Sequence, residues 1–446
     1  MRAGFSKVRI SPEVGAPLCG FAARQAVSSG IHDDLYARAL VLSNDAAALA
    51  IVSVEVLAVS EPIVEEARCR AASLTGLAPR SILIAATHTH SGPVTLNSFF
   101  NTGQPVDAAY IERLIGSIAT AIEQAWNNRF DAMVGIGAGN VRGIAANRRP
   151  PDRNLVDETV GVIKISDAAN RTRALLVHYA CHLTVLGADN TLVTADFAGA
   201  CVTDIENALG PGGFAMYLNG AEGNVSVGHS PELSAIGATT ADRTFKRAGE
   251  LGRRLASSAL RAAAGILCRP DLELNFSASA AQLRCRPFAP ADELREILRQ
   301  ADEQLARLIE QDVNGKQLNQ AKLDRVFASI TIANAALSRA CDGRQEIGLQ
   351  VLRIGDSMWA AVPGELFVEV GLELRRARAH PVFVVGLAIG YQGYFPTRAA
   401  FDQGGYEVVA ARFVPETAAC IASAILEAGS QIFPEEASRL WPRTRV

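Results

Sequence analysis

The sequence predicts an α/β fold in which mixed β-sheets are flanked by helices. Apolar runs of strand length alternate along the chain with segments whose apolar residues recur at helical spacing. The pattern of residues 48–86 predicts a strand, a helix and a second strand in succession. With 446 residues, of which 49% are hydrophobic and 20% charged, the chain can bury a large core.

The first elements carry the clearest start and stop signals. Residues 37–57 contain two apolar runs separated by a polar turn, which predicts two paired strands. Pro62 near the start and Gly76 at the end delimit a helix. A strand over 81–86 follows. Strand, helix and strand together predict a parallel crossover unit, which is right-handed in nearly all proteins.

The rest of the chain continues this alternation. Helices are expected over 108–126, 196–209, 239–264 and 365–377, and strands over 132–139, 159–166, 173–179, 214–218, 347–354, 358–362 and 382–387. Apolar spacing between 290 and 341 predicts two helices that turn at Asn314-Gly315. We interpret residues 1–446 as one domain and this helical hairpin as an insertion.

Charge and cysteine content exclude several function classes. There are 43 basic and 46 acidic residues, the net charge is -3, and neither sign forms a long run, so no nucleic-acid partner is expected. Eight cysteines without a Cys-x-x-Cys pair and an amino terminus without an apolar leader predict a cytoplasmic protein with reduced thiols. A homo-oligomer is compatible with the sequence.

A membrane span is not expected either. The most apolar stretch, residues 46–59, is too short to cross a bilayer and is interrupted by Glu55. We therefore expect no stable membrane insertion. Glu55 itself is either a group that supports a site or an ordinary buried or capping carboxylate.

Two histidines follow the apolar run 82–86, in the string THTHSGP at 87–93. In an extended chain His88 and His90 point to the same side. Two imidazoles at the end of a buried strand suit a metal site. The alternative is one structural histidine and one that caps the next turn.

Other polar residues also stand after apolar runs. His182 ends one such run, and Glu365 follows another at an expected helix start, where it serves the helix dipole or acts as an oxygen ligand. Asp196 is a helix cap or an acceptor for an imidazole. Tyr391 and Tyr394 lie in a glycine-rich loop that is either packing or part of a site.

Three other kinds of site are weakly supported. The loop 219–226 lacks the Gly-x-Ser-x-Gly turn of serine hydrolases. Residues 135–139 resemble a dinucleotide-binding loop, but no helix clearly follows them. Ser91-Gly92 stands where a metallo-β-lactamase-like site needs an Asp-His pair. The polar loop 147–154 is either a solvated connection or part of a site.

Taken in order, these loops resemble the neutral, non-lysosomal ceramidases. The matching strings are THTHSGP at 87–93, NR at 147–148, HLT at 182–184, GNVS at 223–226, PGE at 363–365 and GY at 393–394, followed by Tyr406. The resemblance extends from Arg2 to Glu407 and covers the family's catalytic domain. It implies a neutral-ceramidase-like α/β fold without the carboxy-terminal immunoglobulin-like module.

The resemblance also implies a zinc site. Zinc would be held by His88, His182, Glu365 and Tyr394. Such nitrogen and oxygen ligands leave room for water, whose pKa zinc lowers to about 7.

Four more roles follow from the resemblance. His90 would lie beside the metal water, and the chemistry of amide cleavage further predicts that it passes a proton to the leaving amine. Arg148 and Tyr406 would contact polar groups of the substrate, and Tyr406 or Arg148 would also help to hold the oxyanion. Ser226 would occupy the position of the family's reactive-site serine.

The chain departs from the family pattern at Leu183 and Val227, where the family often has Pro, and at Asn224, where it has Asp. The last change removes a charge beside Ser226. We expect a zinc-dependent amidohydrolase that cleaves an N-acyl amide by attack of a metal-bound hydroxide. Its small-molecule substrate would be smaller or more polar than ceramide. The alternatives are a zinc esterase or lactonase at the same site, and a catalytically silent binding homologue.

Overall fold

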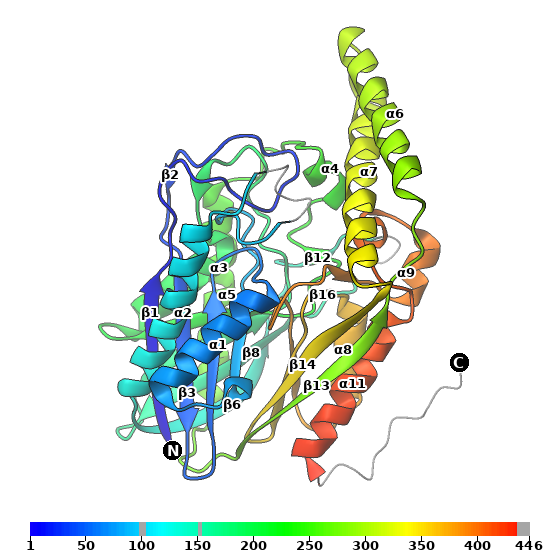
Figure 1. The fold of residues 1–446 in the computed structure, drawn as a ribbon. Coiled ribbons are helices and arrows are strands. Elements are labelled where there is room, and N and C mark those ends of the chain that lie inside the picture. Colours follow the sequence, from blue (N-terminus) through cyan, green and yellow to red (C-terminus); the bar gives the residue numbers. More distant parts are fainter. Residues whose placement is uncertain (98–103, 150–153, 435–446) are drawn as a thin grey trace.

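The computed structural model describes residues 1–97, 104–149 and 154–434, and its largest element is an eight-stranded mixed sheet (Figure 1). The strand order is β11-β9-β8-β6-β1-β3-β4-β5. These strands are β1 (Arg2–Arg9), β3 (Tyr36–Ser43), β4 (Ala48–Val54), β5 (Ile82–Ala86), β6 (Phe130–Asn140), β8 (Thr159–Asp167), β9 (Thr172–Tyr179) and β11 (Phe214–Asn219). The predicted α/β fold with mixed sheets flanked by helices is confirmed.

The sheet curls, so that its edge strand β11 approaches the other edge strand, β5. The curl also brings Phe214 of β11 onto Phe5 of β1, a strand in the middle of the sheet, with ring centroids 5.0 Å apart. At the end of β11, Asn219 donates a hydrogen bond of 3.1 Å from its side-chain amide to the carbonyl oxygen of Thr87, just beyond β5. The curl therefore brings the carboxyl ends of strands from opposite edges to one place.

Helices cover the outside of the curled sheet (Figure 1). They are α2 (Ala108–Asn127) beside β1 and β3, α1 (Glu61–Thr75) beside α2, and α3 (Asp196–Leu209) and α5 (Phe245–Gly265) beside β6, β8, β9 and β11. α2 buries one face, which carries Leu114, Ile118 and Ile122. α1 ends at Gly76 with a φ of 76°, a conformation that glycine adopts readily, as the sequence predicted.

A second sheet of four strands packs against the core of the first. Its strands, in order, are β13 (Leu274–Arg284), β14 (Arg344–Ile354), β15 (Ser357–Ala361) and β17 (Val382–Val385). Leu352, Trp359 and Phe383 face the core that the two sheets share. Neighbouring residues point the other way, toward α8 (Val368–Arg376) and α11 (Thr417–Ile432), because side chains alternate along a strand.

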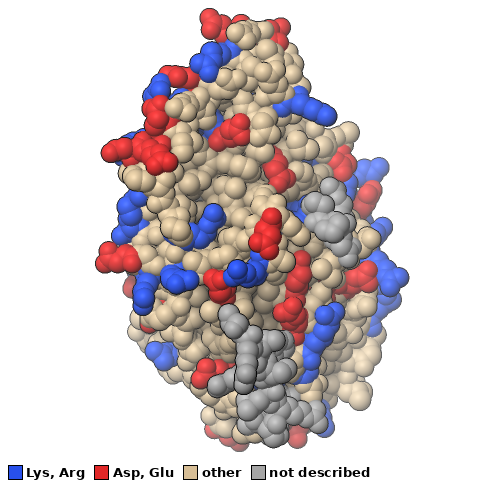
Figure 2. Space-filling view, turned by 90° about the vertical axis from the view of Figure 1, so that its right-hand side faces the viewer, with Lys and Arg blue, Asp and Glu red and all other residues tan. Residues whose placement is uncertain are grey.

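The two helices expected between 290 and 341 are α6 (Ala291–Glu310) and α7 (Lys316–Ala340), and they project from the body as a hairpin (Figure 1). On the face shown in Figure 2, acidic and basic side chains are interspersed, as the sequence led us to expect. None of the helices in the described residues has the length and apolar character needed to cross a membrane.

Short elements place the loops of the candidate site. They are β2 (Gly30–Ile31), β7 (Ala146–Asn147), β10 (Leu192–Val193), β12 (Val225–Ser226), β16 (Glu365–Leu366), β18 (Tyr394–Phe395), α4 (Pro231–Ala235), α9 (Arg398–Gln403), α10 (Tyr406–Ala410) and a 3-10 turn at Pro79–Ser81. β12 pairs with β7, and β16 pairs with β18, so Glu365 lies opposite Tyr394.

Two predicted helix boundaries are wrong. The helix expected from Glu365 begins only at Val368, because Glu365 donates its backbone N–H to the carbonyl of Gly393 (2.9 Å) and belongs to β16. Glu365 is thus not at a helix amino terminus. The helix expected from residue 239 begins after Thr244, whose side chain caps it. Strands β1 and β13 were not predicted.

Candidate metal centre

Three buried histidines gather where β5 and β9 end. The ligand nitrogens of His88, His90 and His182 all lie within 4.8 Å of one another, close enough to hold a metal ion. Ring centroids are 4.7 Å apart for His88 and His90 and for His88 and His182, and 5.9 Å for His90 and His182.

The backbone does not present the first two histidines as expected. His88 has a φ of 74°, so the chain turns at this residue and the predicted extended His-x-His segment is wrong. The turn is held by the N–H of His88, which donates to the carbonyl of Val56 (3.0 Å). His88 and His90 nevertheless meet, because the turn brings their rings edge to face.

Each imidazole is oriented by main-chain carbonyl groups. Because a carbonyl oxygen can only accept, Nδ1 carries the proton and Nε2 carries the lone pair that binds a metal. The acceptors are Leu57 for His88 (2.8 Å), Gly20 for His90 (2.8 Å), and Glu222 and Val225 for His182 (3.0 Å each). Among the described residues, Nε2 of His88 and of His90 has no hydrogen-bond partner although it is buried. The residues present therefore fit a metal ion.

Glu365 and Tyr394 complete the cluster. Oε2 of Glu365 lies 2.9 Å from Nε2 of His182 and 3.7 Å from Nε2 of His88. The hydroxyl of Tyr394 lies 3.4 Å from Nε2 of His182. The structure thus brings together the four side chains expected to hold zinc, with His90 beside them.

The protonation states suit metal binding. Burial, followed by the charge of Arg148, lowers the pKa of His182 to about 4, and burial also lowers the pKa of His88 and, further, of His90. Burial by itself would raise the pKa of Glu365, but the neighbouring His88 and His182 bring it down to about 2. At neutral pH the imidazoles are neutral and the carboxylate is ionised, as metal ligands must be.

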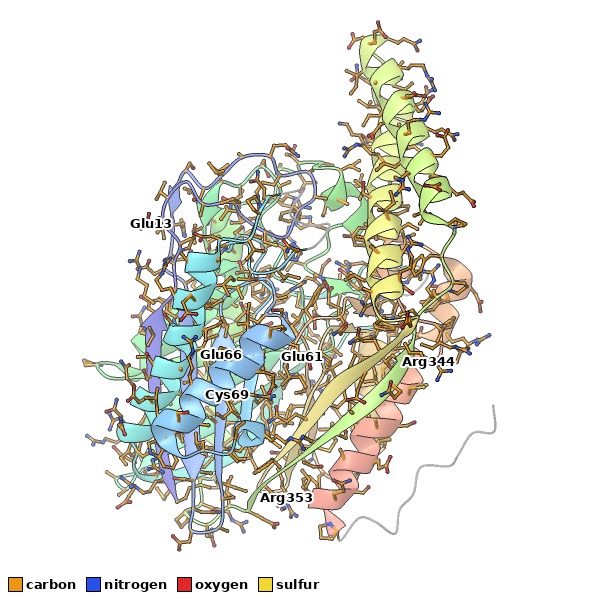
Figure 3. The ribbon with its side chains drawn as sticks, in the orientation of Figure 1. Glu13, Glu61, Glu66, Cys69, Arg344 and Arg353 are labelled. Atoms are coloured by element: carbon orange, nitrogen blue, oxygen red, sulfur yellow. The ribbon has the colours of Figure 1, made fainter. Side chains whose placement is uncertain are left out.

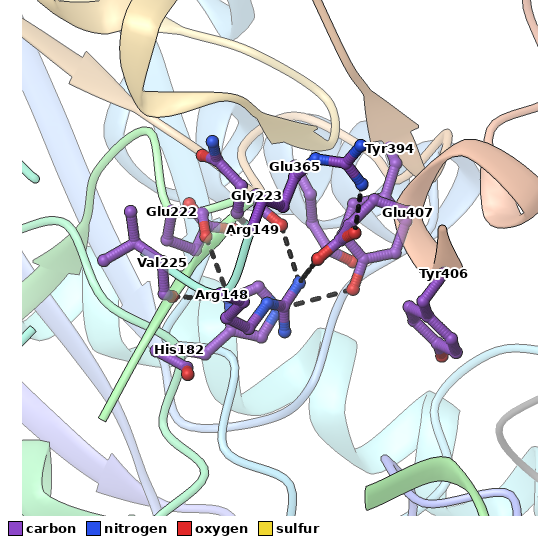
Figure 4. Close-up of polar contacts among 12 residues, drawn as sticks. Arg148, Arg149, His182, Glu222, Gly223, Val225, Glu365, Tyr394, Tyr406 and Glu407 are labelled. Atoms are coloured by element: carbon purple, nitrogen blue, oxygen red, sulfur yellow. Dashed lines mark hydrogen bonds and ion pairs between the residues drawn. The ribbon is translucent and has the colours of Figure 1, made fainter. Parts of the chain in front are cut away.

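The side chain of Arg148 is buried next to this cluster (Figure 4). It donates to the carbonyl of Gly223 (2.7 Å) and lies 3.1 Å from Oε1 of Glu407. Arg149 holds the other carboxylate oxygen of Glu407 at 2.9 Å. This part of the loop 147–154 is therefore buried and charged, whereas residues 150–153 fall outside the described residues.

A small cavity of about 30 Å³ adjoins the cluster. His90, Arg148, Tyr394 and Tyr406 all form part of its lining. Tyr406 begins α10, and its ring lies 6.1 Å from that of Tyr394, nearly perpendicular to it. The residues expected to contact the substrate, Arg148 and Tyr406, thus share one cavity with His90.

Ser226 is buried on β12, and its hydroxyl makes local contacts. Oγ donates to the carbonyl of His229 (3.1 Å) and accepts from the N–H of Gly228 (3.3 Å). Ser226 is not among the residues that line the small cavity. Its expected reactive role stays a prediction.

The structure explains why residue 224 is Asn. Its side-chain amide donates to both carboxylate oxygens of Glu369 (2.8 and 3.1 Å), and its Oδ1 accepts from the N–H of Val368 (2.9 Å). An aspartate at this position would oppose the charge of Glu369. The negative charge at this place in the fold thus belongs to Glu369, which contacts the side chain of residue 224.

Two carboxylates with open roles have structural partners. Asp196 accepts from the N–H groups of Phe197 (2.7 Å) and Leu186 (3.3 Å). Glu55 is paired with Arg38 (2.8 Å) inside the core. Both hydrogen-bonding patterns favour the structural interpretation over support of an imidazole.

Sequence reasoning missed several residues of the site. Arg24 donates to the carbonyl of His90 (2.8 Å), and a side-chain carbon at Gly20 would lie 2.7 Å from His90. Tyr391 donates to Oε1 of Glu365 (2.6 Å). Tyr391 was singled out in its glycine-rich loop without a definite role, whereas nothing local marked Gly20 or Arg24.

An α/β scaffold whose strand ends gather three imidazoles and a carboxylate is typical of metal-dependent hydrolases. A family model described as neutral/alkaline non-lysosomal ceramidase, N-terminal, matches residues 3–225, half of the chain. The chain therefore belongs to this ceramidase family of hydrolases, as its motifs had indicated.

Individual relatives agree with this assignment. A neutral ceramidase of Mycobacterium tuberculosis (strain ATCC 25618 / H37Rv) is 27% identical over 224 residues, which cover 46% of this chain and 34% of that protein. The match thus spans about one third of the relative. The crystal structure of the Pseudomonas aeruginosa neutral ceramidase has a TM-score of 0.77, with 18% identity over 97% of this chain and 74% of that one. A ceramidase complexed with C2 gives a TM-score of 0.75, at 18% identity over 97% and 75% of the two chains. These two structures support the fold.

Proposed function

We propose that the chain is a zinc-dependent amidohydrolase that cleaves an N-acyl amide. The observation that carries this proposal is the approach of Oε2 of Glu365 to within 2.9 Å of His182 and 3.7 Å of His88, in protonation states that suit a cation. Zinc is proposed over other metals because imidazole, carboxylate and phenol form a nitrogen and oxygen ligand set that zinc accepts.

His88, His182, Glu365 and Tyr394 are the proposed ligands, and His90 is kept for proton transfer. Oε2 of Glu365 lies near Nε2 of His88 and Nε2 of His182. One metal ion could therefore be bound by all three side chains. His90 lines the small cavity, where a substrate group would meet it.

A zinc ion held there would polarise an amide carbonyl and make water acidic enough to act as a nucleophile at neutral pH. The chain itself supplies the remaining functions. His90, anchored through Nδ1 to Gly20, would take up a proton from the attacking water at Nε2 and pass it to the leaving amine. Arg148 and Tyr406, on the wall of the same cavity, would hold the oxygen on which negative charge develops.

A large groove next to the centre favours an amide with one apolar arm. Its volume is about 1200 Å³, and its lining includes Val326, Ile330 and Ala333 of α7, Ile63 of α1, and Tyr391. We call this space the apolar groove. Glu61, labelled in Figure 3, lies at the end of α1 that borders it.

The apolar groove and the small cavity have Ala22 as a common wall residue. Charged and amide side chains also line the groove, among them Glu61, Arg325 and Arg412. We therefore propose that the apolar arm of the substrate lies in the groove and that the whole amide is smaller or more polar than ceramide.

The test is a hydrolysis screen with the purified full chain. N-acyl amides of increasing acyl length and the matching esters are compared, and zinc content is measured on the same sample. We expect about one zinc per chain, loss of turnover on chelation, recovery with added zinc, and faster cleavage of amides than of ceramide. Faster turnover of esters or lactones would assign the esterase alternative instead. A chain that binds no zinc and cleaves neither class would be a silent homologue, contrary to the proposal.

A further inference from the structure

The small cavity has a second polar side that the proposed reaction does not use. Besides the residues already discussed, Thr184 and His229 contribute to its lining. Thr184 follows His182 by two residues, and His229 follows the turn that begins at Ser226. Two different loops therefore present polar side chains to one cavity.

Both side chains hold an atom that lacks a partner. Among the described residues, Oγ1 of Thr184 and Nε2 of His229 are buried and make no hydrogen bond, and the same is true of Nε2 of His90. Buried polar atoms of folded proteins are normally paired with protein groups or with ordered water. Three such atoms around one cavity form a site for a small polar group, which is either a water molecule or a polar group of the substrate that replaces it.

The orientation of His229 indicates whether the bound polar group is a hydrogen-bond donor or an acceptor. The backbone of Val185 acts on the ring so as to raise its pKa, as a carbonyl oxygen does when it faces a protonated ring nitrogen, and we therefore place the proton on that nitrogen. Nε2 therefore has a lone pair and acts as an acceptor. Burial and the nearby Arg243 lower the pKa of His229 to about 4, so the ring remains neutral at physiological pH. The residue is also held in place by Ser226, which donates to its carbonyl (3.1 Å).

The volume limits the size of the group. A cavity of about 30 Å³ exceeds the space of about 10–15 Å³ that one water molecule needs. It therefore has room for a hydroxyl or an amino group. An acceptor on His229 and a hydroxyl on Thr184, which can accept or donate, match such a hydrogen-bond donor.

We propose that Thr184 and His229 form a polar subsite that binds a compact hydrogen-bond donor, a hydroxyl or N–H group, on the leaving amine of the substrate. The inference rests on the proposed function, in which His90 protonates the leaving amine. Since His90 lines the same cavity, the amine side of the amide faces Thr184 and His229, while the apolar arm lies in the groove.

Two amides that differ only in the donor group test the subsite. N-octanoyl ethanolamine carries a hydroxyl where N-octanoyl propylamine carries a methyl group. We expect the zinc-loaded full chain to prefer the ethanolamine compound by at least about tenfold in kcat/KM, because the methyl compound leaves the buried polar atoms unpaired. The same preference is measured as a ratio of Kd values by calorimetry.

His229→Leu and Thr184→Val should each reduce the preference by about three- to tenfold, the usual effect of one neutral hydrogen bond. His229→Gln, which retains an acceptor, should keep part of it. His380→Leu is the control, because His380 packs on Phe433 near the end of α11. Circular dichroism shows that each variant is folded, and its zinc content shows that the metal is bound. Thr184→Val hardly changes the side-chain volume, so it still tests the subsite if His229→Leu does not fold.

The outcomes separate this inference from the proposed function. If the wild-type chain cleaves both amides and the variants keep the full preference, the subsite is refuted and the amidohydrolase stands. If the chain cleaves neither amide, the proposed function fails, and the Kd ratio still decides on the subsite. Equal Kd values for the two compounds, or no binding of either, would overturn the subsite.

Discussion

The hydroxyl of Tyr391 lies 2.6 Å from Oε1 of Glu365, and the same tyrosine forms part of the wall of the apolar groove. Burial, reinforced by the charge of Glu365, keeps the pKa of Tyr391 well above its ordinary value, so the hydroxyl remains a donor. One carboxylate oxygen is thereby fixed by Tyr391, while the other faces His182 and His88. Tyr391 is a positioning residue for a proposed metal ligand.

Replacing Tyr391 by Phe should therefore weaken zinc binding. Loss of a partner that orients a ligand usually lowers metal affinity about 10- to 100-fold. Zinc affinity is measured by competition with a chelator. Tyr110→Phe is the matched control, since the hydroxyl of Tyr110, a residue of α2, donates to the carbonyl of Ile10 (2.8 Å) and not to a residue of the centre. Equal zinc affinities for the two variants would contradict the positioning role.

Single alanine substitutions should distinguish the residues that bind zinc from the residue that transfers a proton. We expect His88→Ala and Glu365→Ala to lose bound zinc, because each removes a proposed ligand. His90→Ala should retain zinc and lose about 10²- to 10⁴-fold in kcat, the usual contribution of general acid catalysis. Metal analysis and steady-state kinetics on the same samples check this. Loss of zinc from His90→Ala would instead make His90 a ligand.

Asn224→Asp should destabilise the fold although it restores the family's residue. The substitution places a carboxylate against Glu369 and removes two hydrogen bonds to that charge (2.8 and 3.1 Å). A hydrogen bond to a charged group contributes about 1.5–3 kcal/mol, so the free energy of unfolding should fall by about 2 kcal/mol. Urea denaturation measures it. The double variant Asn224→Asp with Glu369→Gln should recover most of the loss, and no recovery would show that Glu369 is not the cause.

The pairing of Asp157 with Arg375 should make stability depend on pH in the acid range. Burial alone would raise the pKa of Asp157, but two contacts with the guanidinium of Arg375 (2.7 and 2.5 Å) lower it below the ordinary value of 3.8. The native state thus binds this proton less readily than the unfolded state, and the stabilisation is complete above about pH 4. It disappears as the pH falls through the native pKa.

The measurement compares the wild type with Asp157→Asn between pH 7 and pH 2. We expect the difference in free energy of unfolding to be largest near neutral pH and to shrink below about pH 4. A difference that stays constant with pH would mean that the charge of Asp157 contributes nothing.

Local signals predicted the elements that local interactions determine. α1 is an example, because Pro62 and Gly76 mark its two ends and need no distant partner. Glu365 shows the opposite case. Its Pro-Gly-Glu context is typical of a helix start, but pairing with Tyr394, 29 positions later, draws the residue into β16. The sequence alone does not reveal that pairing.

The candidate site was found through the order of its motifs. No spacing along the chain indicates that His88 and Glu365 meet, and only the family resemblance suggested it. The contact of Gly20 with His90 joins residues 70 positions apart and has no motif of its own. His229 was missed because a histidine in a polar loop carries no signal until a cavity is seen beside it.

All three histidines of the centre are steered by carbonyl oxygens, and every amino acid carries one. Leu57, Glu222 and Val225 act on the rings through their peptide groups, so a substitution at these positions removes no hydrogen-bond acceptor from the histidines. A displacement of the loops that carry these peptide groups would instead rotate the imidazoles away from a common point.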